Sequence, residues 1–565
     1  MRRTLLALGT ATGVAVAGLG LTGSAGADQG IGLTGLPAAN HKAPGLSSPN
    51  VLSPELAQVA RAQGSMVVEN PQGGIGYYGY DSVANDPTLL PTLQDGSLSE
   101  AHKTEPDKNT YLVLHGQTGP DASYDYGSHF LFQGHESGVP GYVTRVNLDA
   151  DKAHRVTVLA TQDQDGPLPD FDGSTYDPFS RKLLLSAEAG CSSTAGVWQG
   201  DPSYAANAAH TTFQSLGGIL GRGGFEGVQT ASDGSIWLVE DVGGAATGSN
   251  KKAKLPNSFV YRFVPTDKAD LTRGGALQAL QVTSARTGKP LTFRSLAPFG
   301  DDIADLHSYG KSFATRWVTV HDTASAGSEP FCAGDLAKAA GATPFKRPEN
   351  GMFRPGKGFG EFYFTETGDT DRTSPANDSS QSTDGSLTDP DNRYGGLGGV
   401  FRLAQAGPSA STGTLTLAVK GDLAHTGFDN LAFLTADQLA VVEDAGDTMH
   451  RQRDALDSGF VYDVSQRQPR AVRFLAEGRD PSATLDSALA DAHASGFSND
   501  GDNEITGIHV SDGDPSVDGL LGAKEPQPFS RGWRVFWTEQ HGDNVTWEVV
   551  PDPVPGSYGD RRDRG

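Results

Sequence analysis

Short hydrophobic runs that end in a glutamate recur along the sequence. They are rich in β-branched and aromatic residues, which favour extended strands. In most cases a glycine follows within a few residues, which is typical of a turn. The runs occupy residues 183–188, 236–241, 362–366, 439–444 and 535–539, and in the second and fourth an aspartate follows the glutamate. The pattern predicts a mostly β protein in which such strands end in an acidic side chain.

A second acidic residue precedes each run at a nearly constant distance. Glu226 lies 14 residues before Glu240, and Asp429 lies 14 residues before Glu443. The other pairs are Asp172 with Glu188, Glu349 with Glu366 and, with an insertion, Glu504 with Glu539. Each repeat therefore predicts a pair of strands that brings two carboxylates to one end.

The spacing of the repeats is typical of a β-propeller. Positions 188 and 240 are 52 residues apart, and propeller blades need roughly 40 to 50 residues. The sequence predicts an all-β fold, a single large β-propeller of six or seven blades with loop insertions. In a propeller the innermost strand of every blade faces one axis, so equivalent acids from different blades would meet there.

The predicted propeller spans residues 66–550, after a loosely ordered lead-in at residues 28–65 and before a polar tail at residues 551–565. Residues 1–27 are typical of a signal peptide, because Arg2 and Arg3 precede a short apolar run that ends near an A-x-A cleavage site. The paired arginines also fit a twin-arginine signal. We expect a secreted protein with no stable membrane insertion, since no later apolar stretch reaches the ~20 residues of a span.

Composition narrows the choice of partners. Subtracting 68 acidic from 44 basic residues gives a net charge of −24, which excludes nucleic acid and anionic membranes as expected partners because both require a basic face. The two cysteines, Cys191 and Cys332, would form one disulfide in an oxidising compartment. Alternatively, Cys191 is a soft metal ligand.

Carboxylates that converge on one axis raise one another's pKa unless a cation binds between them. Calcium is the natural candidate, because it takes about 6 to 8 oxygen ligands in flexible geometry. The candidate metal ligands are Glu136, Asp172, Glu188, Glu226, Glu240, Asp241, Glu349, Glu366, Asp429, Glu443, Asp444 and Glu504. The sequence therefore predicts a calcium site at the centre of the propeller.

Several short motifs, in this order along residues 105–550, resemble the PhoX-type alkaline phosphatases and their relatives. They include Gly-His-Glu at 134–136, Ser-Ala-Glu at 186–188, Gly-Phe-Glu-Gly at 224–227 and Arg-Pro-Glu-Asn-Gly at 347–351. The resemblance implies a propeller exported by the twin-arginine route, whose cluster of Ca²⁺ and Fe³⁺ hydrolyses phosphate esters. It also implies that Glu188, Glu226, Glu349 and Asp429 are cluster ligands, with Glu240, Asp241 and Glu366 close by.

One segment departs from the family pattern. Residues 171–177 occupy the place of a cysteine-containing segment but hold no cysteine. An iron–thiolate bond would therefore require Cys191 as a substitute, whereas calcium binding needs only the oxygen ligands.

The predicted function is metal-assisted hydrolysis of a small phosphate monoester or diester by a monomeric protein. Arg347 is the predicted catalytic residue, because its planar guanidinium suits the equatorial oxygens of a phosphoryl group. Its alternative role is a surface salt bridge. Two other functions fit a calcium propeller, a calcium-dependent lactonase or esterase and a non-catalytic, calcium-stabilised module that binds a wall or matrix ligand.

Overall fold

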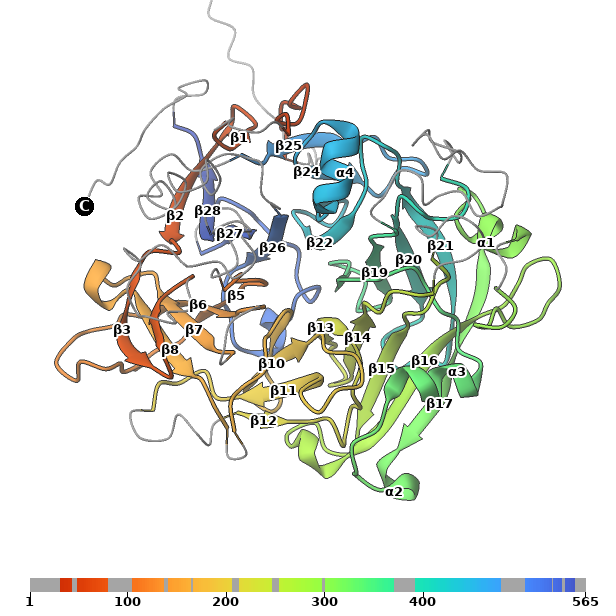
Figure 1. Ribbon diagram of the computed structural model, residues 1–565, viewed down its shortest axis with the longest axis horizontal. Helices are drawn as coiled ribbons and strands as arrows, with labels where there is room; N and C mark the ends of the chain where they lie inside the picture. Colours follow the sequence, from red (N-terminus) through yellow and green to blue (C-terminus); the bar gives the residue numbers. More distant parts are fainter. Residues whose placement is uncertain are drawn as a thin grey trace, which may run out of the picture.

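The computed structural model describes residues 31–42, 48–79, 104–136, 141–163, 166–205, 213–245, 254–296, 300–369, 392–478, 504–530, 532–540 and 544–553. The predicted signal peptide and most of the predicted tail lie outside these residues. In the described part of the chain, antiparallel sheets follow one another around a ring (Figure 1). The predicted β-propeller is therefore confirmed.

The described sheets make six blades, and in each the chain enters at the innermost strand and moves outward. The first blade consists of β5 (Thr110–Val113), β6 (His129–Gly134), β7 (Val143–Asn147) and β8 (Val156–Ala160). The second consists of β9 (Ser174–Asp177), β10 (Lys182–Ala187), β11 (Gly196–Gly200) and β12 (Gln214–Ser215). The third blade consists of β13 (Phe225–Thr230), β14 (Ile236–Glu240), β15 (Val260–Pro265) and β16 (Gly275–Val282). The fourth consists of β18 (Gly351–Phe353), β19 (Glu361–Glu366), β20 (Gly399–Gln405) and β21 (Thr412–Lys420). The fifth blade consists of β22 (Phe428–Phe433), β23 (Gln438–Glu443), β24 (Ser458–Asp463) and β25 (Val472–Ala476). The sixth contains β26 (Glu504–Ser511), β27 (Arg534–Gln540) and β28 (Val545–Pro551).

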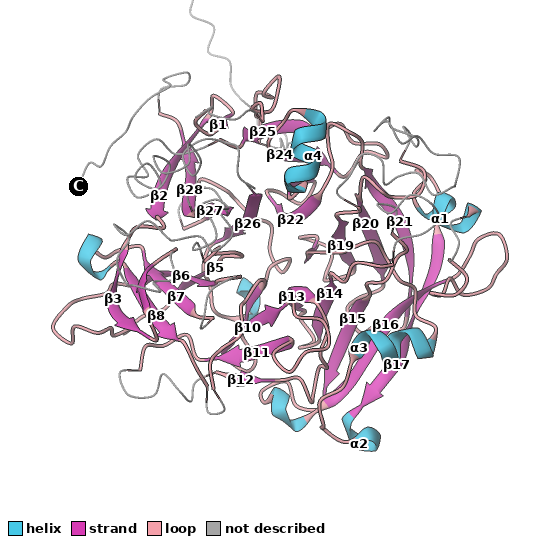
Figure 2. Cartoon of the chain, viewed as in Figure 1, coloured by secondary structure: helices cyan, strands magenta, loops and turns pink. Residues whose placement is uncertain are grey.

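Additional elements lie around these blades. Strand β17 (Phe313–Asp322) pairs with both β16 and β21 and so joins two blades into a nine-stranded sheet. The helices are short and accompany the strands (Figure 2): α1 (Asp301–Leu306), α2 (Thr323–Ala326), α3 (Ala333–Ala340), α4 (Gly446–Arg453), and the 3₁₀ turns η2 (Lys152–His154), η3 (Leu271–Arg273), η4 (Val517–Gly519). Among the described helices, none has the length and apolar character needed to cross a bilayer.

The N-terminal segment closes the ring. Strand β2 (Leu56–Ala62) pairs antiparallel with β28 and completes the last blade, while β1 (Val51–Leu52) pairs with β25. A small hairpin of β3 (Val67–Gln72) and β4 (Ile75–Tyr77) follows. The predicted boundary at residue 66 is therefore corrected, since the propeller begins near residue 51. The lead-in prediction failed because β2 is an edge strand with only two of its seven residues buried, and it is held by hydrogen bonds to a strand almost 500 residues away.

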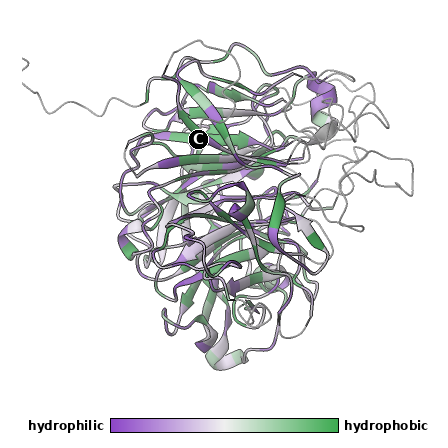
Figure 3. Ribbon diagram, turned by 90° about the vertical axis from the view of Figure 1, so that its left-hand side faces the viewer, coloured by the Kyte–Doolittle hydropathy of each residue, from purple (hydrophilic) through white to green (hydrophobic). Residues whose placement is uncertain are grey.

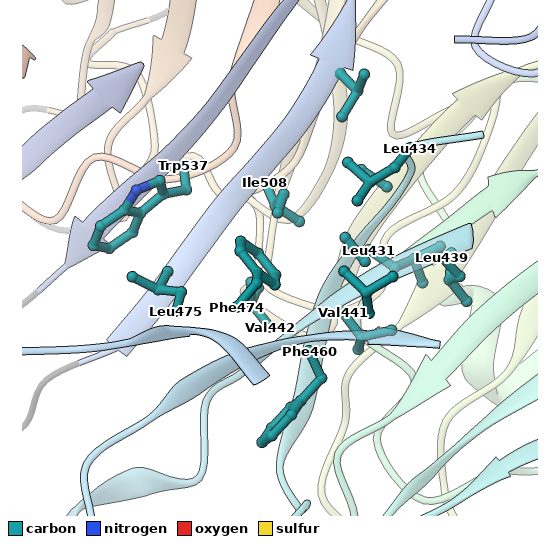
Figure 4. Close-up of a cluster of buried hydrophobic side chains, with 14 of the residues drawn as sticks. Leu431, Leu434, Leu439, Val441, Val442, Phe460, Phe474, Leu475, Ile508 and Trp537 are labelled. Carbon is teal, nitrogen blue, oxygen red and sulfur yellow. The ribbon is translucent and has the colours of Figure 1, made fainter. Parts of the chain in front are cut away.

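The second strand of each blade is buried on both faces, which explains why it is a largely continuous apolar run, whereas the outermost strand β21 alternates between buried and less buried residues. In β14 every residue is buried, and in β23 all but the first. Hydrophobic clusters fill the space between neighbouring blades, and hydrophobic residues accordingly follow the strands (Figure 3). The largest cluster lies between the last two blades and contains Leu431, Val441, Phe460 and Trp537 (Figure 4).

A disulfide joins Cys191 and Cys332, whose Cα atoms are 5.4 Å apart. It connects the loop after β10 to the start of α3, across 141 residues. In the chain-entropy model, closing a loop of this length stabilises the folded state by about 4 to 5 kcal/mol. Of the two alternatives for Cys191, the disulfide is the observed one, so its sulfur is not a thiolate ligand.

The cluster between the last two blades should dominate local stability. We expect Trp537→Ala to lower the free energy of unfolding by about 3 to 5 kcal/mol, because a fully buried indole is lost and a cavity remains. Urea denaturation measures the change. The control is Val264→Ala, since Val264 is 42% exposed and its truncation should have little effect. Equal losses from both variants would contradict the packing described here.

Candidate metal centre

The acids of the repeat reach the centre of the ring because they lie at the start of the innermost strands. Asp172 and Glu349 come just before β9 and β18, while Glu226 and Asp429 are the second residues of β13 and β22. The innermost strands of neighbouring blades contact one another. Acids that are far apart in the sequence therefore meet at one end of the ring.

The Gly-Phe-acid motif has a local structural reason. The amide of Asp444 donates a 2.7 Å hydrogen bond to the carbonyl of Gly427, and the amide of Asp241 donates a 2.6 Å bond to that of Gly224. A Cβ atom on Gly427, whose φ is 62°, would lie 2.4 Å from the carbonyl oxygen of Asp444. Glycine thus permits the close approach of two strands. The phenylalanine after it is buried in the core, and the acid after that lies at the ring centre.

Six acids gather in two groups, in each of which one carboxylate oxygen per residue lies within 4.8 Å of the other two. At an effective dielectric constant of about 20, two unit charges about 5 Å apart repel by roughly 3 kcal/mol. Each group therefore requires protons or a cation to be stable. The first group is Glu226, Glu349 and Asp429, all buried, and the second is Glu136, Asp172 and Glu188, which range from buried to exposed.

Burial and mutual repulsion raise the pKa values in the first group. Burial raises the pKa of Glu226 well above its usual value, and the charges of Asp172 and Glu349 add to the effect. Burial, together with the charge of Asp107, raises the pKa of Asp429 to about 7. Because Asp172 belongs to the second group, the two groups act on each other.

The second group reaches solvent. Burial and the charge of Asp107 raise the pKa of Asp172. Loss of surrounding water and the charges of Asp241 and Glu136 raise the pKa of Glu188, although Glu188 is exposed on its accessible surface. Glu136 also accepts a 2.7 Å hydrogen bond from the side chain of Gln540. This group therefore marks the open side of the centre.

Arg347 lies beside the first group in an unusual backbone conformation. Its φ is 55°, in the left-handed region that favours glycine, and the amide of Thr367 donates to its carbonyl as that of Asp444 does to Gly427. Its guanidinium contacts Asp241 at 2.7 Å and Glu349 at 3.1 Å. These two acids hold the pKa of Arg347 well above its usual value against the effect of burial, which lowers it. The predicted catalytic arginine is thus part of the acid cluster and not a surface ion pair.

Two further residues at the centre were not predicted. Asp107 precedes β5, is 3% exposed, and accepts a hydrogen bond from Thr506. Lys108 is 1% exposed and donates to Asn350. The spacing rule missed this blade because Asp107 lies 29 residues before Glu136, owing to a long loop between β5 and β6. The glycine-histidine-glutamate motif at 134–136 could have directed a search upstream.

Three of the predicted ligands turn into the blades. Glu240 accepts hydrogen bonds from Phe259 N at 3.1 Å and the Tyr261 hydroxyl at 2.9 Å. Glu366 accepts from His307 and from Lys346 N, both at 2.7 Å, and Glu443 pairs with Arg453 at 2.9 Å. None of the three belongs to either group, because their oxygens bind strands of their own blade or the adjoining loops.

The residues that follow these glutamates point the other way, as successive side chains on a strand do. Asp241 binds Arg347, and the charge of Asp444 contributes to the raised pKa values of Glu349 and Asp429. Glu504, at the first position of β26, is part of neither group. Thus Glu240, Glu366 and Glu443 stabilise the blades, whereas Asp241 and Asp444, which follow two of them, face the centre.

Asn430, next to Asp429 in the sequence, carries a buried amide oxygen without a hydrogen-bond partner among the described residues. Asn430 is fully buried, and its Nδ2 donates to both carboxylate oxygens of Asp429 at 2.7 Å. A buried carbonyl oxygen without a donor is costly and is also a common calcium ligand. The donor set therefore fits a hard cation.

The family model for alkaline phosphatase PhoX matches residues 254–516. No curated protein matches the chain. The predicted resemblance to the PhoX phosphatases is confirmed, and the family match supports a hydrolase of the phosphatase class.

Solved structures resemble this fold as well. Pseudomonas fluorescens PhoX in complex with vanadate, a transition state analogue, aligns with a TM-score of 0.51 and 12% identity over 92% of this chain and 98% of that chain. Sqt1 from Chaetomium thermophilum aligns with a TM-score of 0.31 and 12% identity over 80% of this chain and 98% of that chain. The first likeness shows the propeller fold, and the second is too weak to inform the site.

The raised pKa values predict how pH affects the metal-free protein. Asp429 has a pKa of about 7 in the folded state, compared with about 4 in an unfolded chain. Between these values the folded state binds more protons than the unfolded state, so the free energy of unfolding should fall as the pH rises from about 4 to about 7. Urea denaturation in EDTA across this range measures the slope.

Two controls accompany that titration. Asp429→Asn should flatten the slope, because its side chain no longer titrates. Excess calcium should oppose the loss, since the ion binds the deprotonated acids. A slope that neither the substitution nor calcium changes would contradict the electrostatic account.

Proposed function

Given this resemblance, we propose that the chain is a secreted, metal-dependent phosphate-ester hydrolase that holds a calcium-containing cluster at the centre of its propeller. The proposal rests on two groups of three acids, in each of which one carboxylate oxygen per residue lies within 4.8 Å of the other two. The anchored guanidinium of Arg347 lies next to them. An array of acids this dense favours a cation, and the arginine beside it favours an anionic substrate.

The residues present fit calcium. Glu226, Glu349 and Asp429 supply carboxylates from three different blades, with one oxygen of each within 4.8 Å of the other two. The second group would hold another ion nearer to solvent. Bound cations would supply positive charge that neutralises the phosphoryl oxygens of the ester.

Arg347 is suited to bind the phosphoryl group. Its Nε and Nη2 are held by Asp241 and Glu349, whereas its Nη1 has no partner among the described residues. The side chain is 22% exposed. A fixed guanidinium with a free N–H edge can donate to equatorial phosphoryl oxygens at little entropic cost. The strained backbone at this position is consistent with a functional role, since strain of this kind persists at active sites.

Iron, which the resemblance also implies, would have to be held here by oxygen ligands. The disulfide removes Cys191 as a thiolate, and the chain has no free cysteine. The proposed cofactor is therefore Ca²⁺, with Fe³⁺ as a second metal only on carboxylate ligands. The proposed substrate is a small phosphate ester, and we propose a monomer exported by its signal peptide.

The function is tested on the mature chain, residues 28–565, purified with calcium. We expect it to hydrolyse p-nitrophenyl phosphate or its bis ester, to lose this activity in EDTA and to regain it with calcium. Metal analysis of the same sample decides whether iron is present. Hydrolysis of p-nitrophenyl acetate or a lactone without phosphatase activity would favour the esterase alternative. If calcium raises only the melting temperature and no substrate turns over, the non-catalytic module is favoured.

The role of Arg347 has its own test. Arg347→Lys keeps the charge but loses the planar fork, so kcat/KM for the phosphate ester should fall by roughly 100-fold. The calcium content should be retained. Arg402→Lys is the matched control, because Arg402 pairs with Glu361 at 2.6 Å on the outer part of its blade. If Arg347→Lys left kcat/KM unchanged, Arg347 would not bind the phosphoryl group.

A further inference from the structure

Lys108 is a buried cation among the acids of the ring. It follows Asp107 at the start of the first blade, and its side chain is almost completely shielded from water. Burial lowers the pKa of Lys108, and the negative charges of four nearby acids oppose this effect: Asp429, Asp107, Glu226 and Asp172. These acids belong to both groups or adjoin them, so one ammonium faces the whole ring.

The ammonium is tied to the first group through an amide. Lys108 Nζ donates to Asn350 Oδ1, and this contact directs Asn350 Nδ2 toward Glu226 Oε1 at 3.0 Å and Asp429 Oδ1 at 3.3 Å. Asn350 is thus a hydrogen-bond donor to the acids and offers them no oxygen. The lysine, the asparagine and the two acids form a continuous polar chain.

Lys108 differs from the other buried lysine nearby. Lys346 is 2% exposed and forms a direct ion pair with Asp369 at 2.7 Å. Lys108, in contrast, forms no salt bridge with any single acid among the described residues. Its positive charge is shared by several carboxylates, as the charge of a bound metal ion would be.

We propose that Lys108 is a fixed cation of the carboxylate ring, which supplies part of the positive charge that metal ions would otherwise provide and so limits how many calcium ions the centre binds and how tightly. The inference rests on the proposed calcium cluster. A buried ammonium beside the carboxylates opposes the binding of a divalent cation to them, because like charges repel more strongly where water is excluded. A lysine at this place therefore sets the calcium affinity of the ring.

The test compares calcium binding by the wild-type chain, Lys108→Met and Lys108→Arg, using competition with a chromophoric chelator and metal analysis. Lys108→Met should bind calcium at least about tenfold more tightly or bind an additional ion, because it removes the opposing charge. Its melting temperature should also rise more on adding calcium. Lys108→Arg should behave as wild type. Calcium bound equally or more weakly by Lys108→Met would overturn the proposal.

Two controls separate charge from packing. Asn350→Leu breaks the polar chain but keeps the lysine, so calcium binding should weaken or stay the same, opposite to Lys108→Met. Lys346→Met removes a buried lysine whose ammonium pairs with Asp369, outside the two carboxylate groups, and should leave calcium affinity unchanged. If the wild-type chain binds no calcium at all, the proposed cluster fails, which is distinct from failure of the lysine inference.

A measurement on the wild-type chain covers the case in which Lys108→Met does not fold. Acetylation with acetic anhydride in excess calcium, followed by peptide mass spectrometry, should leave Lys108 and Lys346 unmodified while the exposed Lys152 reacts. If calcium displaces the ammonium from the ring, Lys108 will become acetylated. That result would overturn the proposal.

Discussion

The mutual repulsion of carboxylates at the centre of the ring is the constraint on which the site depends. Neighbouring acids in each group are close enough to repel by several kcal/mol, and no single blade could hold them together. The apolar clusters between blades provide the opposing stability. The propeller thus holds a high density of negative charge that protons, metal ions or buried basic side chains must neutralise.

Two basic residues meet this charge in different ways. Arg347 lies beside the first group, is anchored by two acids, and keeps 22% of its side chain exposed. Lys108 is buried and connects to the acids through Asn350. In the proposals above, Arg347 binds the substrate, and Lys108 changes the calcium affinity of the carboxylate ring. Their different exposure, and not their charge, separates the two roles.

The backbone at Arg347 links strain to function. Equivalent positions before the innermost strands accept a hydrogen bond from the neighbouring strand, and Gly427 adopts the positive φ without cost. An arginine in the same conformation costs about 1 to 2 kcal/mol. The ion pairs with Asp241 and Glu349 offset this strain and fix the guanidinium in place.

The sequence by itself determined the fold class and most of the centre, because apolar runs that stop at acids repeat with a blade-length period. It also determined which strands carry acids, since Asp172, Glu188, Glu226, Glu349 and Asp429 all reach the two groups. Only the tertiary structure decided the direction of each side chain. Glu240 and Asp241 are adjacent in sequence, yet strand alternation sends the first into the blade and the second to the centre. Likewise, only the closed ring brings Asp107, Lys108 and strand β2 to their partners, because these contacts join segments hundreds of residues apart and leave no local periodicity.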